Sequence, residues 1–447
     1  MSLKRGQGSV SERRKKGEKN KKREQERGNF MKRKISSKLY IRRQKMKKFV
    51  FIFLISALIL SSVLQSKTLG RSSNSIESIS RKPIDVFAVI PSYSANKYGS
   101  LLEALKARYN TKIIDEKDIS SLPLPEHGMC FITFGDKNLL KQQLEKGLVK
   151  FSVKDIPTNK DDVTESRNEM EKTALIHNPG IKLDLGDSEQ YTSVLYGVRI
   201  LPNGATDEIE GQSNLGIPDL ESITNWIEET YSDSLSDAKS LPKPTSTQAS
   251  ASWVLKGSCT NYSERYPYGK VYYGVQFWKL VNEGDNTYDY WAVAYTNYST
   301  IPGWYLYNSG YQTYLAWIYN VPLSSAETLL DWDPTSTVSN TSYTVTIGGS
   351  PTLSWTYSIP AIIVYDYSDP TPSANKTCWY VDYANSRDQA ACTATFANRP
   401  GSEFRIPNGS SFGIQLLFTG GFAYSHWYGW DSTAYATAAI GNYSVGP

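Results

Sequence analysis

Histidine and cysteine are scarce in this chain, which has three His and four Cys among its 447 residues. No His-x-x-x-His or Cys-x-x-Cys spacing occurs, so the sequence offers no metal site. The glycine-rich signatures of nucleotide binding are missing, which leaves a phosphate without a cradle and predicts no cofactor. A Gly-x-Ser-x-Gly nucleophile elbow is missing too. The sequence therefore identifies no catalytic residue.

Acids and aromatic residues are rare at the start of the chain. Residues 1–48 hold 20 Lys/Arg and four Asp/Glu, a net charge of +16, and subtraction from the totals of 49 and 44 leaves a net charge of 29 − 40 = −11 beyond them. Phe30 and Tyr40 are the only rings in this basic segment. Because proteins that bind single strands stack bases on aromatic rings, we do not expect nucleic acid as a partner.

A single apolar run, Phe49–Leu64, comes directly after the basic segment. Its 16 residues lie between the length of a signal-peptide core and that of a membrane span. A cleaved signal and a retained anchor both stay open, and Met31 and Met46 are alternative translation starts. A basic flank before an apolar run predicts export of the remaining, C-terminal part of the chain. We expect a protein that is secreted or held at the extracellular face of the membrane by this segment.

Composition divides the chain into segments with different expected structures. The spacer and the linker are rich in Ser, and the linker also in Pro and Thr, with no periodic apolar pattern. The expected segments are a basic cytoplasmic tail or misassigned start (1–48), a signal peptide or anchor (49–66), a spacer (67–83), an α/β domain (84–231), a linker (232–252) and an aromatic-rich, N-glycosylated β-sandwich (253–447).

Strand and helix patterns alternate in the segment 84–231. Ile84–Ile90 is a buried-strand run, Tyr98–Tyr109 has apolar residues at helical spacing, and Met129–Phe134 is another apolar strand. A short strand is also expected at Ala174–Ile176, and a helix at 219–231. This alternation predicts a parallel or mixed sheet with helices packed on it, layered as in flavodoxin-like folds.

The segment 253–447 holds ten of the 11 Trp and many short alternating runs between Gly, Pro and Asn. That pattern is typical of an all-β sandwich. Gly303–Pro322 is the one stretch that could form a membrane-inserting hairpin. Its alternation is broken at Asn308-Ser309-Gly310, which favours a plain hairpin instead.

Six Asn-X-Ser/Thr sequons lie beyond the apolar run, all of them in the β segment. Their clustering in the exported part predicts an N-glycosylated surface. The expected glycosylation sites are Asn261, Asn297, Asn340, Asn375, Asn408 and Asn442.

Four cysteines in an exported chain invite pairing. Cys378 and Cys392 would close a loop of about 15 residues, and such a bridge contributes roughly 3 kcal/mol. We expect this disulfide. Cys130 falls in a buried strand and Cys259 has no local partner, so free thiols and a bridge between the two remain alternatives.

Carboxylates of the β segment are the best candidates for hydrolysis, because glycosidases need two acids beside stacking rings. Several of them precede Asn or Pro, where Asp caps a turn. The candidates are Asp285, Asp289, Asp331, Asp333, Asp366 and Asp369. A separate aromatic group, His426, Trp427, Tyr428 and Trp430, is expected to be exposed as a ligand or partner surface.

Three short segments carry a resemblance. SWTYSIP (354–360), YDYSD (365–369) and PGSEFR (400–405) resemble a loosely defined group of secreted or cell-surface glycoproteins of thermophilic archaea. The resemblance covers roughly the last 110 residues. It implies an extracellular, N-glycosylated β domain and assigns no catalytic residue.

Together these features predict a non-enzymatic surface glycoprotein that binds glycans or other surface proteins through its β-sandwich. Adhesion and the assembly of a coat or appendage, including self-assembly, are the expected roles. A secreted hydrolase with paired carboxylates and a membrane-inserting β protein are the alternatives.

Overall fold

The computed structural model describes most of the chain from residue 84 onwards. The described ranges are 84–156, 160–186, 191–229, 251–303, 310–335, 342–349, 351–358, 363–383, 396–397, 399–426 and 429–447. All of them belong to one compact unit, Lys82–Pro447. The predicted tail, signal or anchor, spacer and most of the linker lie outside these ranges.

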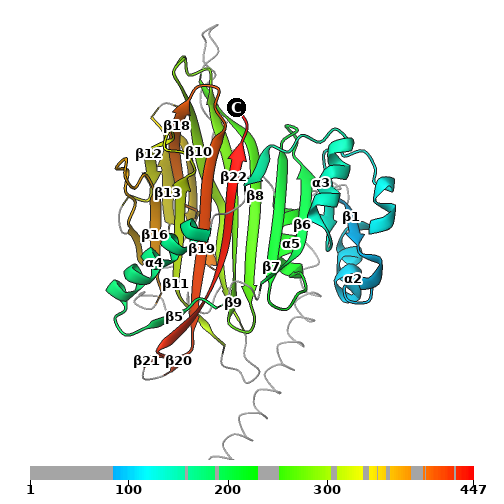
Figure 1. Ribbon diagram of the computed structural model, residues 1–447, viewed down its shortest axis with the longest axis horizontal. Helices are drawn as coiled ribbons and strands as arrows, with labels where there is room; N and C mark the ends of the chain where they lie inside the picture. Colours follow the sequence, from blue (N-terminus) through cyan, green and yellow to red (C-terminus); the bar gives the residue numbers. More distant parts are fainter. Residues whose placement is uncertain are drawn as a thin grey trace, which may run out of the picture. The chain divides into compact units, whose positions relative to one another are not determined.

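Strands predominate in the described ranges, and four α-helices accompany them there (Figure 1). The strands are β1 (Asp85–Ile90), β2 (Asn110–Asp115), β3 (Met129–Thr133), β4 (Val153–Ile156), β5 (Lys182–Asp184), β6 (Thr192–Ile200), β7 (Thr206–Ser213), β8 (Ser252–Arg265), β9 (Gly269–Val281), β10 (Tyr288–Pro302), β11 (Gln312–Pro322), β12 (Thr328–Asp333), β13 (Ser342–Ile347), β14 (Leu353–Ser358), β15 (Ile363–Asp366), β16 (Thr377–Asp382), β17 (Phe396–Ala397), β18 (Gly401–Pro407), β19 (Phe412–Ala423), β20 (Ser425–His426), β21 (Gly429–Trp430) and β22 (Thr433–Val445). The helices are α2 (Gly99–Arg108), α3 (Lys137–Lys146), α4 (Lys160–His177) and α5 (Leu220–Glu228), with 3-10 turns η1 (Ser92–Ser94) and η2 (Glu116–Ser121).

The first part of the chain forms a mixed sheet. β1 pairs in parallel with β2 and β3, and β6 and β7 extend the sheet with antiparallel pairing. Successive side chains of β1 point to opposite faces of the sheet. Val86 packs with α2 and α5, whereas Phe87 packs with α3. Helices therefore cover both faces of this part of the sheet, as an α/β segment requires.

This sheet continues without a break into the β-rich segment. β7 pairs in parallel with β8, with Asp207 opposite Ser258, and β9, β10, β18 and β12 extend the same sheet. The result is one sheet of 11 strands, in which β17 also pairs with β10. The two segments that composition predicts as separate domains thus share backbone hydrogen bonds.

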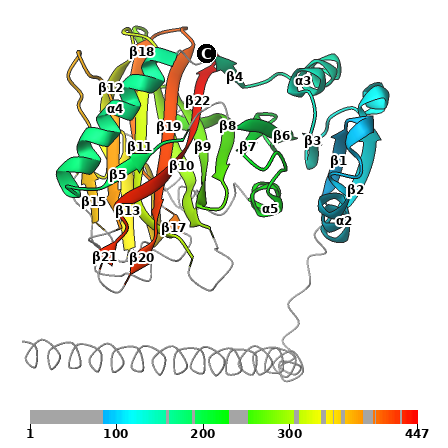
Figure 2. The same cartoon turned by 60° about the horizontal axis from the view of Figure 1, so that its bottom comes forward.

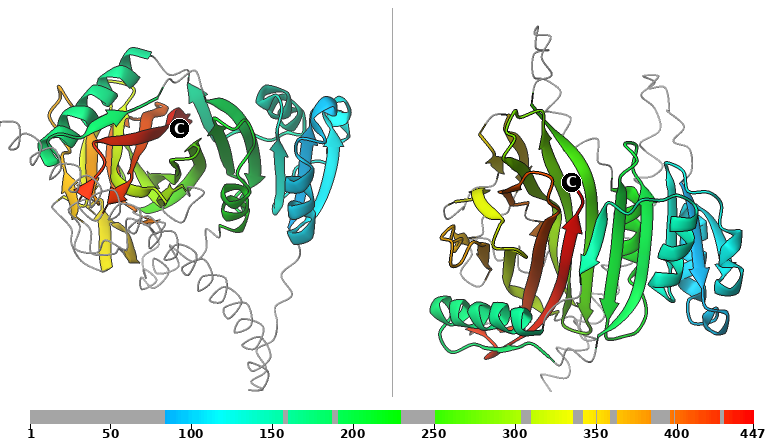
Figure 3. Two further views of the ribbon diagram at one scale, coloured as in Figure 1. Left: turned by 90° about the horizontal axis from the view of Figure 1, so that it is seen from below. Right: turned by 45° about the horizontal axis from the view of Figure 1, so that its top comes forward.

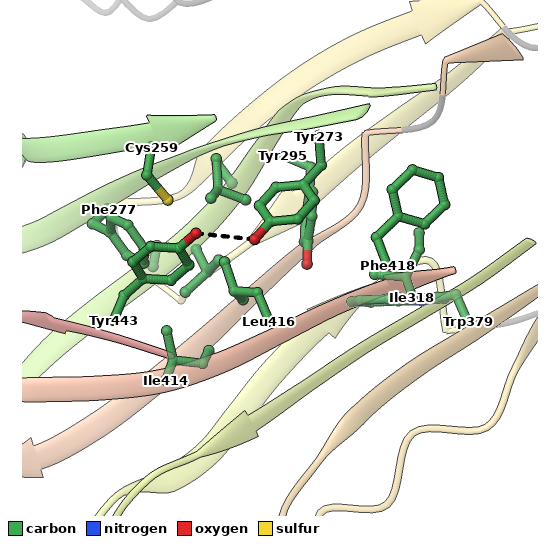
Figure 4. Packing of buried hydrophobic residues seen from close by; sticks show 14 of the residues in the cluster. Cys259, Tyr273, Phe277, Tyr295, Ile318, Trp379, Ile414, Leu416, Phe418 and Tyr443 are labelled. Atoms are coloured by element: carbon green, nitrogen blue, oxygen red, sulfur yellow. Dashed lines mark hydrogen bonds between the residues drawn. The ribbon is translucent and has the colours of Figure 1, made fainter. Parts of the chain in front are cut away.

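A second sheet of seven strands packs against the long strands of the first. Its order is β15-β16-β11-β19-β22-β4, and β5 also pairs with β22. Buried side chains from both sheets fill the space between them, including Phe277, Trp379, Phe418 and Tyr443 (Figure 4). Full burial of each such side chain contributes about 1.5–3 kcal/mol. This is the sandwich that the aromatic composition predicts.

Helix α4 covers the outer face of the second sheet (Figure 2). Met170 and Ala174, one turn apart on the helix, pack with Trp317 and Leu417 in one buried cluster. Strands β4 and β5, which flank α4 in the chain, both pair with β22 on the side opposite β19. The segment 153–184 therefore belongs to the sandwich, although elements of the α/β part precede and follow it in the sequence.

The two sheets approach each other where β8 faces β22. Asn261 donates a hydrogen bond to the carbonyl of Ile440, and Arg265 donates one to the carbonyl of Ala436, at 3.4 and 3.2 Å. The hydroxyls of Ser263 and Thr437 lie 3.0 Å apart between them. Residues two apart on a strand share a face, so Asn261, Ser263 and Arg265 of β8 all point toward β22.

One local prediction is wrong. Ala174–Ile176, expected as a strand, lies within helix α4, because Met170 and Ala174 have helical spacing. The first arm and the turn of the hairpin expected in Gly303–Pro322 lie almost entirely outside the described ranges, and Gln312–Pro322 forms β11 of the second sheet. Within the described ranges, none of the helices combines the length and hydropathy that a membrane span needs.

Candidate functional site

The predicted aromatic surface near the C-terminus lies on a short hairpin. β20 pairs with β21, and His426 Nε2 lies 2.7 Å from Asp431 Oδ1. Trp430 is half-buried, with its ring edge-on to that of Tyr314 at 5.1 Å. Trp427 and Tyr428 lie outside the described ranges. His426 and Trp430 therefore lie on one hairpin, and Trp430 also anchors it to the sandwich.

Four tyrosines gather beside this hairpin at the same end of the long strands. Tyr268 stacks on Tyr435 at 3.8 Å, and Tyr311 meets both of them edge-on. Tyr424 lies between Tyr311 and His426, at 6.3 and 4.8 Å. All are half-buried. We call this set the aromatic end: Tyr268, Tyr311, Tyr424, His426, Trp430 and Tyr435.

Arg265 holds the centre of the aromatic end. Its guanidinium lies 5.1 Å from the ring of Tyr268 and 5.5 Å from that of Tyr435. Asp184 of β5 accepts hydrogen bonds from it through a backbone carbonyl and a carboxylate oxygen. A planar cation stacked on rings and tied to a carboxylate has few rotamers left. The tyrosines are therefore held in place before any ligand arrives.

Exposed apolar side chains adjoin this end. Leu215, Ile217 and Tyr266 are 46%, 41% and 50% exposed. Asn214 exchanges hydrogen bonds with the backbone of Tyr266, which fixes the two loops side by side. Local sequence patterns do not single out this exposed group, because Tyr266 is far from Leu215 and Ile217 in the chain.

A cleft of about 940 Å³ lies among α3, β4, β7, β8 and β22. Figure 3 shows these elements next to one another where the helix-covered part of the sheet meets the sandwich. Lys137 and Lys141, one turn apart on α3, face carboxylates on β4 and β7. Lys137 Nζ lies 2.9 Å from Glu210, and Lys141 Nζ lies 2.8 Å from Asp155. Only the spacing of the two lysines could have indicated this site.

A buried network supports the cleft from below. Lys141 also reaches Glu208 at 3.1 Å, and the Tyr196 hydroxyl donates to Glu208 at 2.5 Å. Burial raises the pKa of Glu208 to about 7, although Lys141 opposes this. Burial opposes the charged form of Lys141, but the carboxylates of Glu208 and Asp155 outweigh it, so the pKa of Lys141 is raised. Lys141 is therefore fixed as a cation.

The six sequon asparagines have different environments. Asn261 and Asn442 are 3% and 4% exposed and line the cleft. Asn375 is half-buried and bonds to the backbone of Leu329 and Glu327. Asn408 is exposed at the end of β18. The side chain of Asn297 and all of Asn340 lie outside the described part of the chain.

The expected disulfide is not formed. Cys378 is a free, buried thiol on β16, where it packs with Tyr380 and Leu417. Its expected partner, Cys392, lies outside the described ranges. Cys130 and Cys259 are also free and buried. Cys378 therefore serves as a small apolar side chain in this position.

Most of the candidate carboxylates hold turns or strands. Asp285 accepts from the backbone of Thr287, Asp369 from that of Thr371, and Asp333 from that of Thr346. Asp366 accepts from the indole of Trp332 at 3.0 Å, and Asp289 pairs with Lys279 at 3.0 Å. The contacts of Asp285 and Asp369 are the turn-capping role that Asp commonly takes, whereas those of the other three acids connect different strands.

Asp331 has an acidic neighbour that the spacing of the carboxylates in the sequence does not indicate. It lies opposite Glu403 in the pairing of β12 with β18. Burial raises the pKa of Glu403 to about 7, and the charge of Asp331 adds to the effect. Asp331 accepts from the backbone of Gly348 at 2.9 Å. Among the described residues, no group of three or more His, Cys, Asp or Glu could hold a metal ion.

His177, at the end of α4, has a structural role. Its ring stacks on that of Tyr380 at 4.7 Å and lies 4.2 Å from that of Tyr365, and its Nε2 bonds to the hydroxyl of Tyr367. Burial lowers the pKa of His177. The ring is therefore neutral at pH 7 and fastens the helix to the sheet.

Comparisons with known proteins give little. No family model matches the chain, and no curated protein matches it. A solved structure described as a pore forming protein is similar over 43% of this chain and 89% of its own, at 10% identity and a TM-score of 0.26. The Clostridium perfringens NetB toxin in its membrane-inserted form covers 43% of this chain and 92% of its own, at 8% identity and a TM-score of 0.23. Likenesses at these TM-scores carry no argument about function.

Proposed function

We propose that this protein is a non-enzymatic extracellular surface glycoprotein that binds a glycan or a surface protein through the aromatic end of its sandwich. Adhesion or the assembly of a surface coat is the role that such binding serves. One observation carries the proposal: six half-buried aromatic or imidazole side chains lie together at one end of the strands, and an ion-paired arginine holds their centre.

Half-buried, rigid rings are suited to binding. Tyrosine and tryptophan present a large apolar face together with a polar tip, and they lose little side-chain entropy on binding. Because Arg265 and Asp184 already order Tyr268 and Tyr435, the cost of ordering them is met by folding rather than by association. The exposed Tyr266 and Leu215 extend the same surface.

The extracellular location rests on the sequence. A basic segment before the apolar run Phe49–Leu64 favours export of the rest, and the exposed sequon at Asn408 is placed to carry a glycan. The resemblance to surface glycoproteins of thermophilic archaea agrees with this location. We also propose that the first part of the sheet has a flavodoxin-like layering and that it acts as a scaffold with no activity of its own.

Binding of the full-length chain to isolated cell envelopes, and to glycans released from them, tests the proposal. Tyr268→Ala and Trp430→Ala should each weaken binding by about tenfold, because buried aromatic anchors dominate such interfaces. Tyr93→Ala is the matched control, since Tyr93 is 90% exposed and lies on η1, outside the aromatic end. Unchanged binding by both variants, with unchanged melting temperatures, would remove the aromatic end as the binding surface.

A further inference from the structure

The cleft among α3, β4, β7, β8 and β22 has a wall of amides. Gln212, Asn261 and Asn442 come from three different strands and line one space. Asn261 is 3% exposed, and its Oδ1 accepts no hydrogen bond within the part of the chain that the structure describes. A buried acceptor without a donor is energetically costly. Because this oxygen is buried, the Asn261 amide must turn toward the cleft before a ligand hydroxyl can supply the donor.

The charged groups of the floor are already compensated. Lys137 pairs with Glu210, and Lys141 pairs with Asp155 and Glu208. A simple ion placed there would have to break one of these pairs. A hydroxyl can instead donate to a carboxylate and accept from an ammonium group at once, because it carries both functions. The floor therefore suits a ligand with many hydroxyl groups.

Apolar side chains interrupt the polar lining. The half-buried Phe151 and Ile440 lie in the same cleft as the amides. Sugar rings have a polar rim and an apolar C–H face, so they need this combination of planar polar groups and apolar contacts. The volume of about 940 Å³ is also in the range of small-ligand sites, roughly 300–1,000 Å³.

The rim adds positive charge. Lys150 and Lys154 line the cleft and are exposed, and neither forms an ion pair with an acid among the described residues. These two ammonium groups outnumber the carboxylate of Glu145, the exposed acid that also lines the cleft, and so favour a ligand that carries a negative charge. A carboxylate on a sugar can pair with Lys150 and Lys154 at the rim, while the sugar's hydroxyl groups can hydrogen-bond to the ion-paired side chains of the floor.

We propose that this cleft binds an acidic saccharide, with Gln212 and Asn261 recognising hydroxyl groups and Lys150 and Lys154 recognising the sugar carboxylate. The proposal is independent of the aromatic end, which lies at the opposite end of the long strands: β22 begins beside Tyr435 and reaches the cleft at Asn442. It also gives Asn261 and Asn442 a role other than carrying glycans.

Titration calorimetry of the full-length chain with short oligogalacturonates, and with neutral galactans of the same length, tests the proposal. The acidic sugars should bind more tightly. Gln212→Ala should weaken their binding about tenfold through the lost hydrogen bonds. The double variant Lys150→Ala/Lys154→Ala should weaken it by about 5- to 20-fold and abolish the preference over the neutral sugar.

The matched control is Lys117→Ala/Lys146→Ala, which removes two exposed lysines that do not line the cleft. It should leave affinity unchanged. Three results would each overturn the proposal: no binding of either sugar, which would mean that the cleft holds water only; equal weakening by the control, which would indicate attraction to the overall charge; and binding that Gln212→Ala does not change. Melting temperatures of all variants show whether each still folds.

Discussion

Glu403 shows how a single buried acid ties stability to pH. Its ordinary pKa is 4.5, and in the folded chain burial, together with the smaller effect of the charge of Asp331, raises the pKa to about 7. Between these values the folded state binds more protons than the unfolded state. Stability contributed by this group is therefore lost as pH rises from about 4.5 to about 7.

Glu403→Gln removes this titration. At pH 8 we expect the variant to be more stable than the wild type by about 1–3 kcal/mol, a range that allows for solvent screening. The difference should shrink as pH falls below about 4.5. Urea unfolding between pH 4 and pH 8 measures it, with Glu103→Gln as a control because that side chain is 73% exposed. A pH-independent difference would contradict the assignment.

The sequons make a second prediction at the scale of single residues. Asn408 is exposed, whereas Asn261 and Asn442 are nearly inaccessible and hydrogen-bonded within the sandwich. A glycan can be attached to a folded chain only where the amide reaches solvent. Peptide mapping of the native protein by mass spectrometry should therefore find glycan on Asn408 and none on Asn261 or Asn442. Occupancy of Asn261 would mean that the chain is modified before β8 and β22 come together.

At the scale of elements, local patterns predicted strands and helices well where the apolar spacing is strong. β1, α2 and β3 begin and end within about two residues of their expected limits. β22 was not expected, because its Ala-rich sequence, which also holds Gly441 and Asn442, has weak strand propensity. Burial of Ala436 and Ala439 between neighbouring strands determines its conformation instead.

Helix α4 was mistaken for a strand at its end, because three apolar residues in a row fit either structure. Met170 decides between them, since it is fully buried against the second sheet one turn before Ala174. Met170→Ala should lower the free energy of unfolding by about 2–4 kcal/mol. Leu175→Ala, at a 51% exposed position of the same helix, should change it by less than about 0.5 kcal/mol. Denaturant titration compares the two, and equal effects would contradict the packing described for α4.

The candidate site was predictable only in part, because many of its residues are far apart in the sequence. Trp430 and His426 are close in sequence, so a local pattern could suggest them. Tyr268, Tyr311 and Tyr435 come from distant strand ends that meet only when the sheets pair. The cleft is even less local, since α3, β7 and β22 all contribute to it.

At the scale of the whole chain, the continuous sheet has a consequence for folding. The Ser- and Pro-rich linker sequence indicated two independent domains, yet β7 and β8 share a parallel ladder from Asp207–Ser258 to Ser213–Glu264. Strands β4 and β5 also join the edge of β22. We therefore expect one cooperative unfolding transition for residues 82–447.

Ile132→Ala tests this coupling. Ile132 is fully buried in β3, beneath α2 and α5, and its truncation should cost about 2–4 kcal/mol. Ten of the 11 Trp lie in residues 253–447, so tryptophan fluorescence reports almost entirely on the sandwich. If the shared sheet couples the segments, the fluorescence midpoint should fall, and the circular-dichroism signal of α2, α3 and α5 should be lost in the same transition as that of α4, which belongs to the sandwich. Leu124→Ala, at a 71% exposed position, should not move this transition. An early, partial loss of helical signal, with fluorescence unchanged, would show that the ladder between β7 and β8 does not transmit stability and that the two segments fold independently.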